Sequence, residues 1–498
     1  MLKQYVVLPA HGFKSQALAQ AASLRSIVPL AEAVVGSAAA AKAVVSKVDV
    51  IDSVSIDGPK LVEMTPETEL ELRLEEPSLK IVPVVIYEKM RVVYEIERDA
   101  AATVFATAAQ GGVLRIEDTA GNPLTDARVV AFTNFRARAG DEGKTDANGS
   151  VRLRIAPGTT LDRIYVYGPP RYWGRFERSY TLADGASLQL EQIDLTQQLL
   201  ALRRFRANLP LTAGAGVVVG IVDSGIDPHH PLLPNVSGGA NMVLDETKAD
   251  PGQIADWGPA AVEGEHGTHV AGIVGARPAA GIDLAGVAPG VTLRSYRVFP
   301  HTGGGATSYD IMNAIDRAVQ DGCHIINLSL GGGAEDEAVR AAIGSALDNG
   351  VLVIAAAGND GRKPVSFPAA LPFCVAVSAA GWTDSFPSPS TETSDIAKPR
   401  GSNQTFLGAF SNFGPQIDLT GPGVGLVSTL PGGTFGPMSG TSMASPALAG
   451  YAAYLLAADA TILSLAGANK STALRDKLFS SATPLGFGRD YEGFGLPG

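Results

Sequence analysis

A serine with the surroundings of a nucleophile lies near the end of the chain. Ser442 lies in residues 440–446, GTSMASP, directly ahead of a small, apolar run. Because proline is tolerated in the first turn of a helix but not in its interior, Pro446 predicts a helix start, with Ser442 just before or within the first turn. The free N–H groups and the dipole of a helix N-terminus favour negative charge there. Taken alone, the pattern fits better a serine that merely caps a core helix.

An aspartate and a histidine follow expected elements of an α/β fold. The β-branched run at residues 217–222 is typical of a parallel strand buried on both faces, and it ends at Asp223. His266 opens residues 266–272, HGTHVAG, at an expected helix start. A lone histidine there is more often structural. His266 and His269 also suggest two metal ligands, although no cysteine or acidic partner completes a known metal motif.

Helices and strands alternate from about residue 214 onward. Apolar runs predict further strands at 292–298, 324–328 and 351–356, and helical patterns predict helices around 266–274, 309–321 and 335–349. This alternation predicts an α/β fold with a doubly wound parallel sheet. Functional groups gather at the carboxyl ends of the strands in such a sheet, where Asp223 falls.

Together with Asn359, at the end of the run AAGN, the motifs of Asp223, His266 and Ser442 resemble those of the subtilisin-like serine proteases, or subtilases. The resemblance covers residues 205–485 and implies a subtilisin-like fold and a hydrolase, a serine endopeptidase that works through an acyl-enzyme. It implies that Ser442 is the nucleophile, His266 the base and Asp223 the group that orients the imidazole. The Asn359 amide and the Ser442 backbone N–H would donate to the oxyanion.

The resemblance also supplies candidate substrate-binding residues. They should form two edges of the cleft that pair with an extended polypeptide substrate. These residues are Ser329, Leu330, Gly331, Gly303, Gly304 and Gly305. Recognition of this kind reads backbone more than side chains, so it favours broad specificity.

The chain departs from the family pattern at a calcium site. Many subtilases carry His-Pro-Asp where residues 230–232 read HPL, and the loop 276–285 lacks paired asparagines. Calcium prefers six to eight oxygen ligands, so we expect that site to be absent or remodelled, with Asp283 solvated. We expect no metal site and no cofactor, with calcium at non-standard sites as the alternative. A second departure is the stretch 383–407, whose Ser, Thr and Pro content predicts a long surface loop.

An α+β unit is expected over residues 1–100. Strands are predicted at 5–8, 48–56 and 79–87, and helices at 15–26 and after Thr65-Pro66-Glu67. The unit resembles the inhibitor-type propeptide of subtilases. That resemblance implies a zymogen whose own N-terminal domain is an inhibitory partner and whose activation is autoprocessing, with self-cleavage between about residues 88 and 215.

A small all-β sandwich is expected over residues 106–190. Short alternating runs there are separated by turns such as DANG at 146–149. The region resembles the carboxypeptidase-regulatory-like, transthyretin-like sandwich. Asp118, Asp146 and Asn148 suggest calcium ligands, but Asx side chains in turns usually cap backbone N–H groups.

Residues 191–207 are expected to link the sandwich to a catalytic domain over 208–498. The basic cluster at 203–206 is interpreted as a solvated face, with a processing site as the sharper alternative. Two other functions remain open. One is a pseudoprotease that binds through an occupied cleft, and the other is a peptide ligase or restricted processing enzyme with the same chemistry.

Composition excludes several partner classes. A formal net charge of −11, spread without long acidic runs, disfavours nucleic acid, because proteins that bind nucleic acid usually show basic patches. The apolar run at 27–45 is interrupted by charged residues and proline, so no membrane span is expected. Cys323 and Cys374 lie beside apolar runs and are expected to be buried thiols. No signal peptide is recognised at the N-terminus, so a cytoplasmic protein and signal-independent export both remain open.

Overall fold

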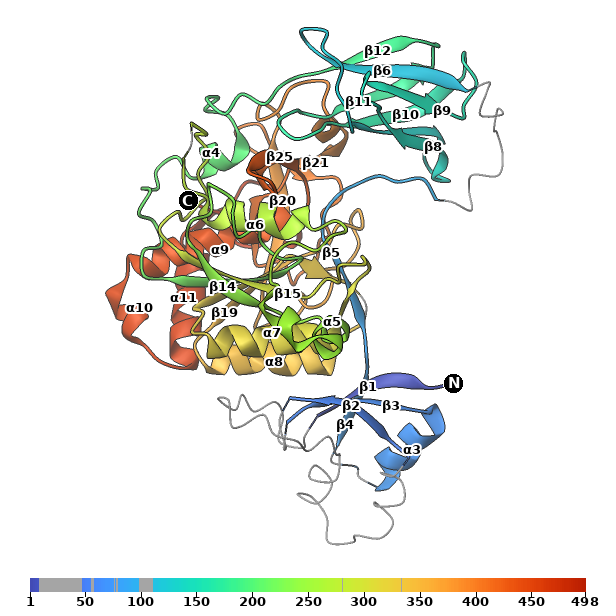
Figure 1. Cartoon of the computed structure of the whole chain (residues 1–498). Helices are drawn as coiled ribbons and strands as arrows, with labels where there is room; N and C mark the ends of the chain where they lie inside the picture. Colours follow the sequence, from blue (N-terminus) through green and yellow to red (C-terminus); the bar gives the residue numbers. More distant parts are fainter. Residues whose placement is uncertain are drawn as a thin grey trace.

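Three units follow one another along the chain. The computed structural model describes residues 1–8, 47–54, 58–75, 77, 79–97, 111–279, 281–332 and 334–498. Figure 1 shows a small unit at the bottom, an α/β unit in the middle and a β-sandwich at the top. The extended segment that holds β5 (Ile86–Lys89) leaves the small unit and runs along the middle one. Among the described residues, no helix has the length and apolar character needed to cross a bilayer.

The central sheet of the middle unit is largely parallel, which confirms the expected α/β class. Its strand order is β14-β15-β13-β17-β19-β20-β22-β21, and β23 also pairs with β20. The pairs from β14 to β20 are parallel, while β22 and β21 are antiparallel at one edge. The strands are β13 (Val218–Asp223), β14 (Val236–Asn241), β15 (Thr292–Arg297), β17 (Ile325–Leu328), β19 (Leu352–Ala356), β20 (Val375–Trp382), β21 (Ile396–Arg400), β22 (Thr405–Gly408) and β23 (Leu419–Pro422).

Helices cover both faces of this sheet. α6 and α9 pack on one face, and α7 and α8 on the other (Figure 1). A separate hydrophobic core lies on each face of the sheet, and successive residues of a strand point into opposite cores. Ile325 packs on the α9 side and Ile326 on the α7–α8 side. The helices are α6 (Glu265–Gly275), α7 (Ser308–Gln320), α8 (Glu337–Asp348) and α9 (Thr441–Ala457). The expected helices and strands of this unit are therefore confirmed.

The helix that carries Ser442 starts earlier than its proline predicts. α9 begins at Thr441, so Pro446 lies inside the helix and the expectation that it marks the helix start is wrong. Proline has no N–H to donate to the carbonyl of Ser442, four positions back. That carbonyl instead accepts a hydrogen bond from the hydroxyl of Ser329, at 2.8 Å. A side chain from another element thus replaces the missing helix bond.

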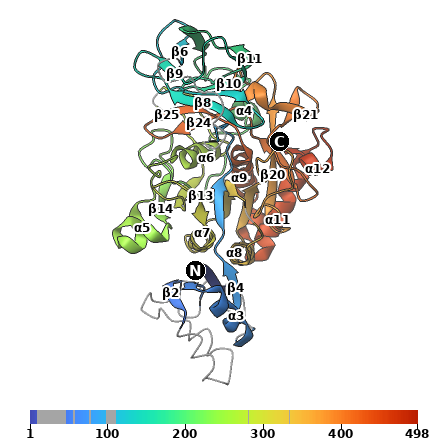
Figure 2. The ribbon, with the colours of Figure 1, turned by 90° about the vertical axis from the view of Figure 1, so that its right-hand side faces the viewer.

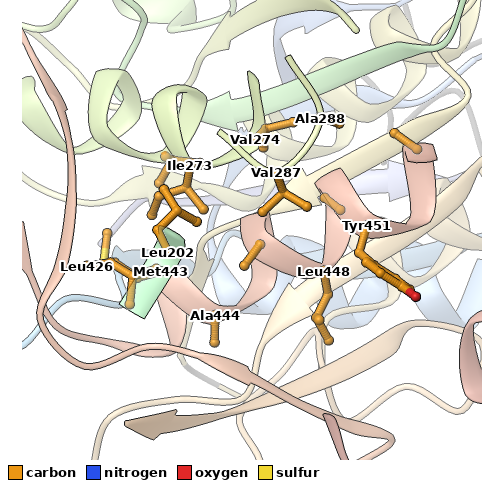
Figure 3. Close-up of a cluster of buried hydrophobic side chains, with 14 of the residues drawn as sticks. Leu202, Ile273, Val274, Val287, Ala288, Leu426, Met443, Ala444, Leu448 and Tyr451 are labelled. Carbon is orange, nitrogen blue, oxygen red and sulfur yellow. The ribbon is translucent and has the colours of Figure 1, made fainter. Parts of the chain in front are cut away.

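The core beside α9 also anchors the segment that precedes the middle unit, which corresponds to the expected catalytic domain and is called the catalytic unit from here on. Figure 3 shows Met443, near the start of α9, close to Ile273 of α6, with Leu448 further along α9 in the same cluster. Leu202 of α4 (Ala201–Phe205) lies in the same cluster. Residues 191–207, expected to be a linker, therefore include a short helix with an apolar anchor in the catalytic core.

The basic residues of this segment contact the catalytic unit. Arg203 pairs with Asp283, and Arg204 pairs with Asp384 at 2.9 Å. The guanidinium of Arg206 donates to the carbonyl of Gly286 at 2.6 Å. These contacts differ from the solvated face that the charge run predicts, because carbonyls and carboxylates of the neighbouring loops complement the three arginines.

The small N-terminal unit is an antiparallel sheet packed on α3 (Pro66–Glu75), and the helix expected after Pro66 is confirmed. Its strands, in the order β2-β3-β1-β4, are β1 (Lys3–Leu8), β2 (Asp49–Ser53), β3 (Lys60–Met64) and β4 (Lys80–Pro83). Tyr5 and Val7 face α3, whereas Val6 and Leu8 join the core of α7 and α8. The strand expected over 79–87 is divided into β4 and β5, and the helix expected over 15–26 lies outside the described residues.

The second unit is a sandwich of the sheets β11-β10-β7-β8 and β12-β6-β9, and the strands expected there are confirmed. The strands are β6 (Gly112–Asp118), β7 (Arg128–Asn134), β8 (Ala139–Lys144), β9 (Ser150–Leu153), β10 (Thr160–Tyr167), β11 (Arg175–Thr181) and β12 (Ala186–Leu190). The carboxylate of Asp118 accepts from the N–H groups of Ala120 and Asn122, and that of Asp146 accepts from Asn148. These aspartates cap turns, as their setting predicts.

The stretch 383–407 is not the surface loop that its composition predicts. It forms the short helix η4 (Thr391–Asp395) and the edge strands β21 and β22. Glu392 and Asp395 are 4% and 3% exposed, and burial raises the pKa of each carboxyl. η4 packs against the sandwich, where Thr391 abuts Gly174. The stretch is ordered because the sandwich covers it, a contact that local composition does not encode.

The remaining elements of the catalytic unit are short and lie around the sheet. The helical ones are α5 (Leu244–Ala249), η3 (Pro251–Ala255), α10 (Ala460–Ser464), α11 (Ala468–Ser480) and α12 (Arg489–Glu492). The strands are β16 (Ala306–Thr307), β18 (Leu330–Gly331), β24 (Leu426–Leu430), β25 (Thr434–Met438), β26 (Ala482–Thr483) and β27 (Leu496–Pro497).

Candidate active site

Asp223 and His266 are brought together by the sheet and the helix that follows it. Asp223 is the last residue of β13, and His266 lies in the first turn of α6. The Nδ1 of His266 is 2.8 and 3.0 Å from the two carboxylate oxygens of Asp223, and both residues are fully buried. The carboxylate fixes the ring so that Nε2 faces away from it. Within the described residues, Nε2 has no hydrogen-bond partner and is available to a neighbouring group.

Ser442 lies at the N-terminus of α9 and is also fully buried. Its hydroxyl donates to the backbone carbonyl of Ser329 at 2.9 Å, while the Ser329 hydroxyl donates back to the carbonyl of Ser442. The Asn327 amide in turn donates to the Ser329 hydroxyl at 2.8 Å. This network, which begins at the carboxyl end of β17, fixes the backbone around Ser442.

Asn359 presents a free amide donor beside Ser442. Its side-chain oxygen accepts from both the backbone N–H and the hydroxyl of Thr441, each at 2.9 Å. The amide nitrogen is buried without a hydrogen-bond partner in the described part of the chain. A Cβ added to Gly440 would lie 3.2 Å from this nitrogen. The amide nitrogen therefore borders the space in front of the Gly440–Ser442 backbone.

The chain's own segment 86–92 lies in the cleft in front of these groups. β5 pairs antiparallel with β16 on one side and with β18 on the other. Figure 2 shows the segment crossing the catalytic unit from the small unit toward the sandwich. β5 thus completes a three-stranded ladder of the kind by which an extended peptide adds to exposed strand edges.

The ladder continues through the candidate catalytic residues. The Met90 N–H donates to the Ser329 carbonyl at 3.2 Å, and the Ser442 N–H donates to the Met90 carbonyl at 3.1 Å. Beyond it, the Val92 N–H donates to the Ser439 carbonyl at 2.9 Å. A Cβ on Gly440 would lie only 2.4 Å from the Met90 oxygen, so glycine is required there for the segment to approach. The Met90 carbonyl therefore lies beside the donors that surround Ser442.

The candidate substrate-binding residues divide into those that contact this segment and those that do not. Leu330 and Gly331 pair with Lys89 and Glu88, and the Ser329 carbonyl accepts from Met90. On the other edge, Gly305 lies against Ile86 and Tyr87, but Ala306 and Thr307 provide the pairing. Gly303 and Gly304 have φ of 83° and 100° and form the turn before this edge. A glycine run marks the turn, whereas the pairing residues next to it carry no sequence signal of their own.

Side chains of the segment lie in defined surroundings. Tyr87 is fully buried, with its ring centroid 6.2 Å from that of Phe367. The methyl group of Met90 lies against Gly331, where an added Cβ would be 2.8 Å from it. Lys89 lies over the Phe299 ring, with its nitrogen 4.9 Å from the ring centroid.

Two glutamates beside His266 bind the basic side chains of this segment. Glu263 contacts both Lys89 and Arg91, at 3.1 Å each, and Glu265 contacts Arg91 at 2.5 Å. Burial raises the pKa of both carboxyls, but the nearby positive charges outweigh it and hold each pKa below its ordinary value. Sequence reasoning missed these two residues. Their only signal was acidic character next to the HGTHVAG motif.

Beyond Arg91 the segment runs along the sandwich. The Tyr94 N–H donates to the hydroxyl of Tyr167 at 2.8 Å, and Glu95 pairs with Arg128 at 2.9 Å. A cavity of about 790 Å³ lies here, lined by the segment, the sandwich and loops of the catalytic unit that include Pro431. The sandwich therefore borders the end of the cleft that follows Arg91.

Residues considered for metal binding have other partners. The Nε2–H of His269 is within 3.0 and 3.1 Å of the carbonyls of Leu426 and Gly436, and burial lowers its pKa to about 3. Leu232, at the position of the family's calcium-binding Asp, is buried in the core. Over the described ranges, no cluster of three or more His, Cys, Asp or Glu side chains is arranged to hold a metal ion.

The part of the chain that holds these residues is similar to known proteins. The family model described as "Subtilase family" matches residues 214–496. Subtilisin NAT of Bacillus subtilis subsp. natto is 38% identical over 277 residues, which are 55% of this chain and 62% of that protein. A subtilisin of Bacillus pumilus is 38% identical over 277 residues, 55% of this chain and 86% of that protein. Subtilisin Savinase of Lederbergia lenta is 36% identical over 240 residues, 48% and 76% of the two chains. The match thus spans less than two thirds of the first of these relatives.

Proposed function

The chain belongs to the subtilase family, and from that premise we propose that it is a serine endopeptidase made as a self-inhibited precursor. The proposed catalytic residues are Asp223, His266, Ser442 and Asn359. The observation that carries the proposal is the hydrogen bond from the Ser442 N–H to the Met90 carbonyl, inside a ladder that fixes the segment on both sides. This is the arrangement of a polypeptide substrate presented for attack.

The reaction follows from the groups at hand. The Ser442 hydroxyl turns from the Ser329 carbonyl to the free Nε2 of His266, which accepts its proton as the oxygen attacks the carbonyl carbon. Asp223 stabilises the imidazolium that forms. The Ser442 N–H and the Asn359 amide donate to the oxyanion, where each such donor typically contributes about 2.7–4 kcal/mol.

Collapse of the tetrahedral intermediate breaks the C–N bond. His266 returns the proton to the leaving amine, which leaves an ester between the acyl group and Ser442. Water, deprotonated by His266, then hydrolyses this acyl-enzyme and regenerates the free hydroxyl. Nucleophile, base and oxyanion donors all come from the chain, so the proposal includes no cofactor for the chemical step.

The same geometry supports a proposal for the bond that is cleaved in autoprocessing. Because the Met90 carbonyl is the one next to Ser442, we propose that the precursor cleaves itself between Met90 and Arg91, inside the interval 88–215 expected from the sequence. The N-terminal unit then acts as the inhibitor. The Val6 and Leu8 face of its sheet packs on α7 and α8, the Lys80 side chain bonds Glu337 at 2.5 Å, and β5 fills the cleft.

Intact-mass analysis of the purified full chain beside a Ser442→Ala variant tests the proposal. We expect the wild type to give fragments 1–90 and 91–498, with Arg91 as the new N-terminus, and the variant to stay intact. A fluorophosphonate probe should label processed wild type at Ser442. Identical trimming of the variant would assign the cut to another protease. A folded chain that neither cleaves itself nor reacts with the probe would instead be a binding protein with an occupied cleft.

A further inference from the structure

Glu263 and Glu265 contact basic side chains on both sides of the peptide bond next to Ser442. Met90 contributes the carbonyl that faces Ser442, so Lys89 is the second residue before the bond and Arg91 the first after it. One oxygen of Glu263 contacts Lys89, and the other contacts Arg91. Glu265 contacts Arg91 alone. One carboxylate therefore spans the bond, and a second reinforces the side that follows it.

The two basic side chains are more enclosed than the carboxylates that bind them. The side chain of Lys89 is 5% exposed and that of Arg91 is 16%, whereas Glu263 and Glu265 remain 45% and 37% exposed. A cation enclosed to that extent must be paired to offset the loss of its hydration. Lys89 also lies over the Phe299 ring, which attracts a cation through its face. The surroundings of Lys89 and of Arg91 therefore favour a cationic side chain at each position.

The backbone ladder fixes which substrate residues reach these positions. An extended peptide held by β16 and β18 can shift its register only by two residues without turning its side chains to the opposite face. The carbonyl at Ser442 fixes the register further. A polypeptide substrate that occupies the cleft in the same register therefore places two residues against Glu263 and Glu265. They are the second residue before the cleaved bond and the first residue after it.

We propose that Glu263 and Glu265 form a charge-selective subsite, so that this protease prefers polypeptides with Lys or Arg at the second position before and the first position after the cleaved bond. The inference rests on the proposed function and names the substrate class of that same site. It restricts the broad specificity that backbone recognition alone would give. Since Glu265 contacts the following residue only, the two positions can be tested separately.

Matched peptides test the subsite with the self-processed full chain. The reference is an internally quenched peptide with the sequence of residues 87–93, YEKMRVV, and the comparisons replace its Arg, or its Lys, by Ala or Glu. For charge-assisted bonds at a partly exposed site, we expect kcat/KM to fall about tenfold for each Ala peptide and further for each Glu peptide. A p-nitroanilide ending in Met at the cleaved bond reports catalysis without any residue after it.

Variants assign the preference to the two carboxylates. Glu265→Gln should reduce the Arg-to-Ala ratio of kcat/KM to about twofold and keep the Lys preference, whereas Glu263→Gln should reduce both. Glu265→Lys should favour the peptide with Glu after the bond. Each ratio is taken within one protein, so a general loss of activity cancels. Asp348→Asn, at the exposed end of α8, removes one negative charge as a matched control and should leave both ratios unchanged.

The outcomes separate the two proposals. Two results would overturn the proposed subsite: equal rates for the Arg and Ala peptides in the wild type, or a wild-type preference retained in both Gln variants. Hydrolysis of the nitroanilide would still support the protease in either case. Absence of hydrolysis of the nitroanilide and of every peptide overturns the proposed function, and the subsite with it.

Discussion

The bond that replaces the missing helix hydrogen bond at Pro446 should be measurable as a coupling between two residues. In the wild type, the Ser329 hydroxyl supplies the donor for the Ser442 carbonyl and accepts from the Asn327 amide. Ser329→Ala removes both at a fully buried site. A buried polar group left unpaired costs about 1–3 kcal/mol, and with about 1–2 kcal/mol for each of the two groups we expect a loss of about 2–4 kcal/mol in the free energy of unfolding.

The second substitution supplies the donor that proline lacks. In a Pro446→Ala chain, the new N–H can bond the Ser442 carbonyl. Ser329→Ala should then cost only the bonds to the Asn327 amide and to the Ser445 hydroxyl, which lies 3.2 Å away, together about 1–2 kcal/mol. The coupling between the two sites should therefore be about 1–2 kcal/mol. Urea unfolding followed by circular dichroism measures it, with every chain carrying Ser442→Ala to prevent self-digestion.

A control and a clear refutation accompany this cycle. Ser480→Ala removes an exposed hydroxyl that donates to a carbonyl of its own helix, and it should change stability by less than about 0.5 kcal/mol. If Ser329→Ala costs the same with proline or alanine at position 446, the two groups are independent. The reasoning that Ser329 replaces a helix bond would then be refuted.

Three further predictions concern the cleft. Asn359→Ala should lower kcat by about 10²–10³ with little change in KM, because the amide acts on the oxyanion; an equal loss in binding of substrate would contradict that role. Gly440→Ala should leave the precursor folded but uncleaved by mass, since the new Cβ would lie 2.4 Å from the Met90 oxygen; normal cleavage would disprove the close approach. Lys89, which stays with the N-terminal unit after cleavage at Met90, helps to hold the pKa of Glu263 below its ordinary range. The attraction is fully present above the pKa of the free carboxyl, and it is lost as the pH falls through the lower pKa of the carboxyl in the complex. The cleaved N-terminal unit should therefore inhibit peptide hydrolysis more weakly at acid pH. Inhibition that does not depend on pH would contradict this prediction.

The N-terminal half of the chain illustrates what local patterns convey. The turn of residues 118–122 was interpretable from sequence because Asp118 caps N–H groups within four residues of itself. The helix that starts at Pro66 was predictable for the same reason, since its signals lie in its own first turn. By contrast, the stretch 383–407 has a loop-like composition, and its order depends on the sandwich that covers η4. The expectation at Pro446 was wrong for a similar reason, because the hydroxyl that replaces the missing proline N–H belongs to Ser329, 113 residues before Ser442.

The sequence by itself determined the family, the alternating α/β elements and the identity of the candidate catalytic residues, because long local motifs carry that information. Only the tertiary structure decided what occupies the cleft. In the sequence, β5 resembles the end of an ordinary strand, and Glu263 and Glu265 carry no functional signal. The fold brings Arg91 beside these two carboxylates, which lie 172 and 174 residues further along the chain. Charge pairing across such a distance depends on three-dimensional position alone, and that is why the bond at Met90 and its acidic neighbours could not be inferred from the chain read in order.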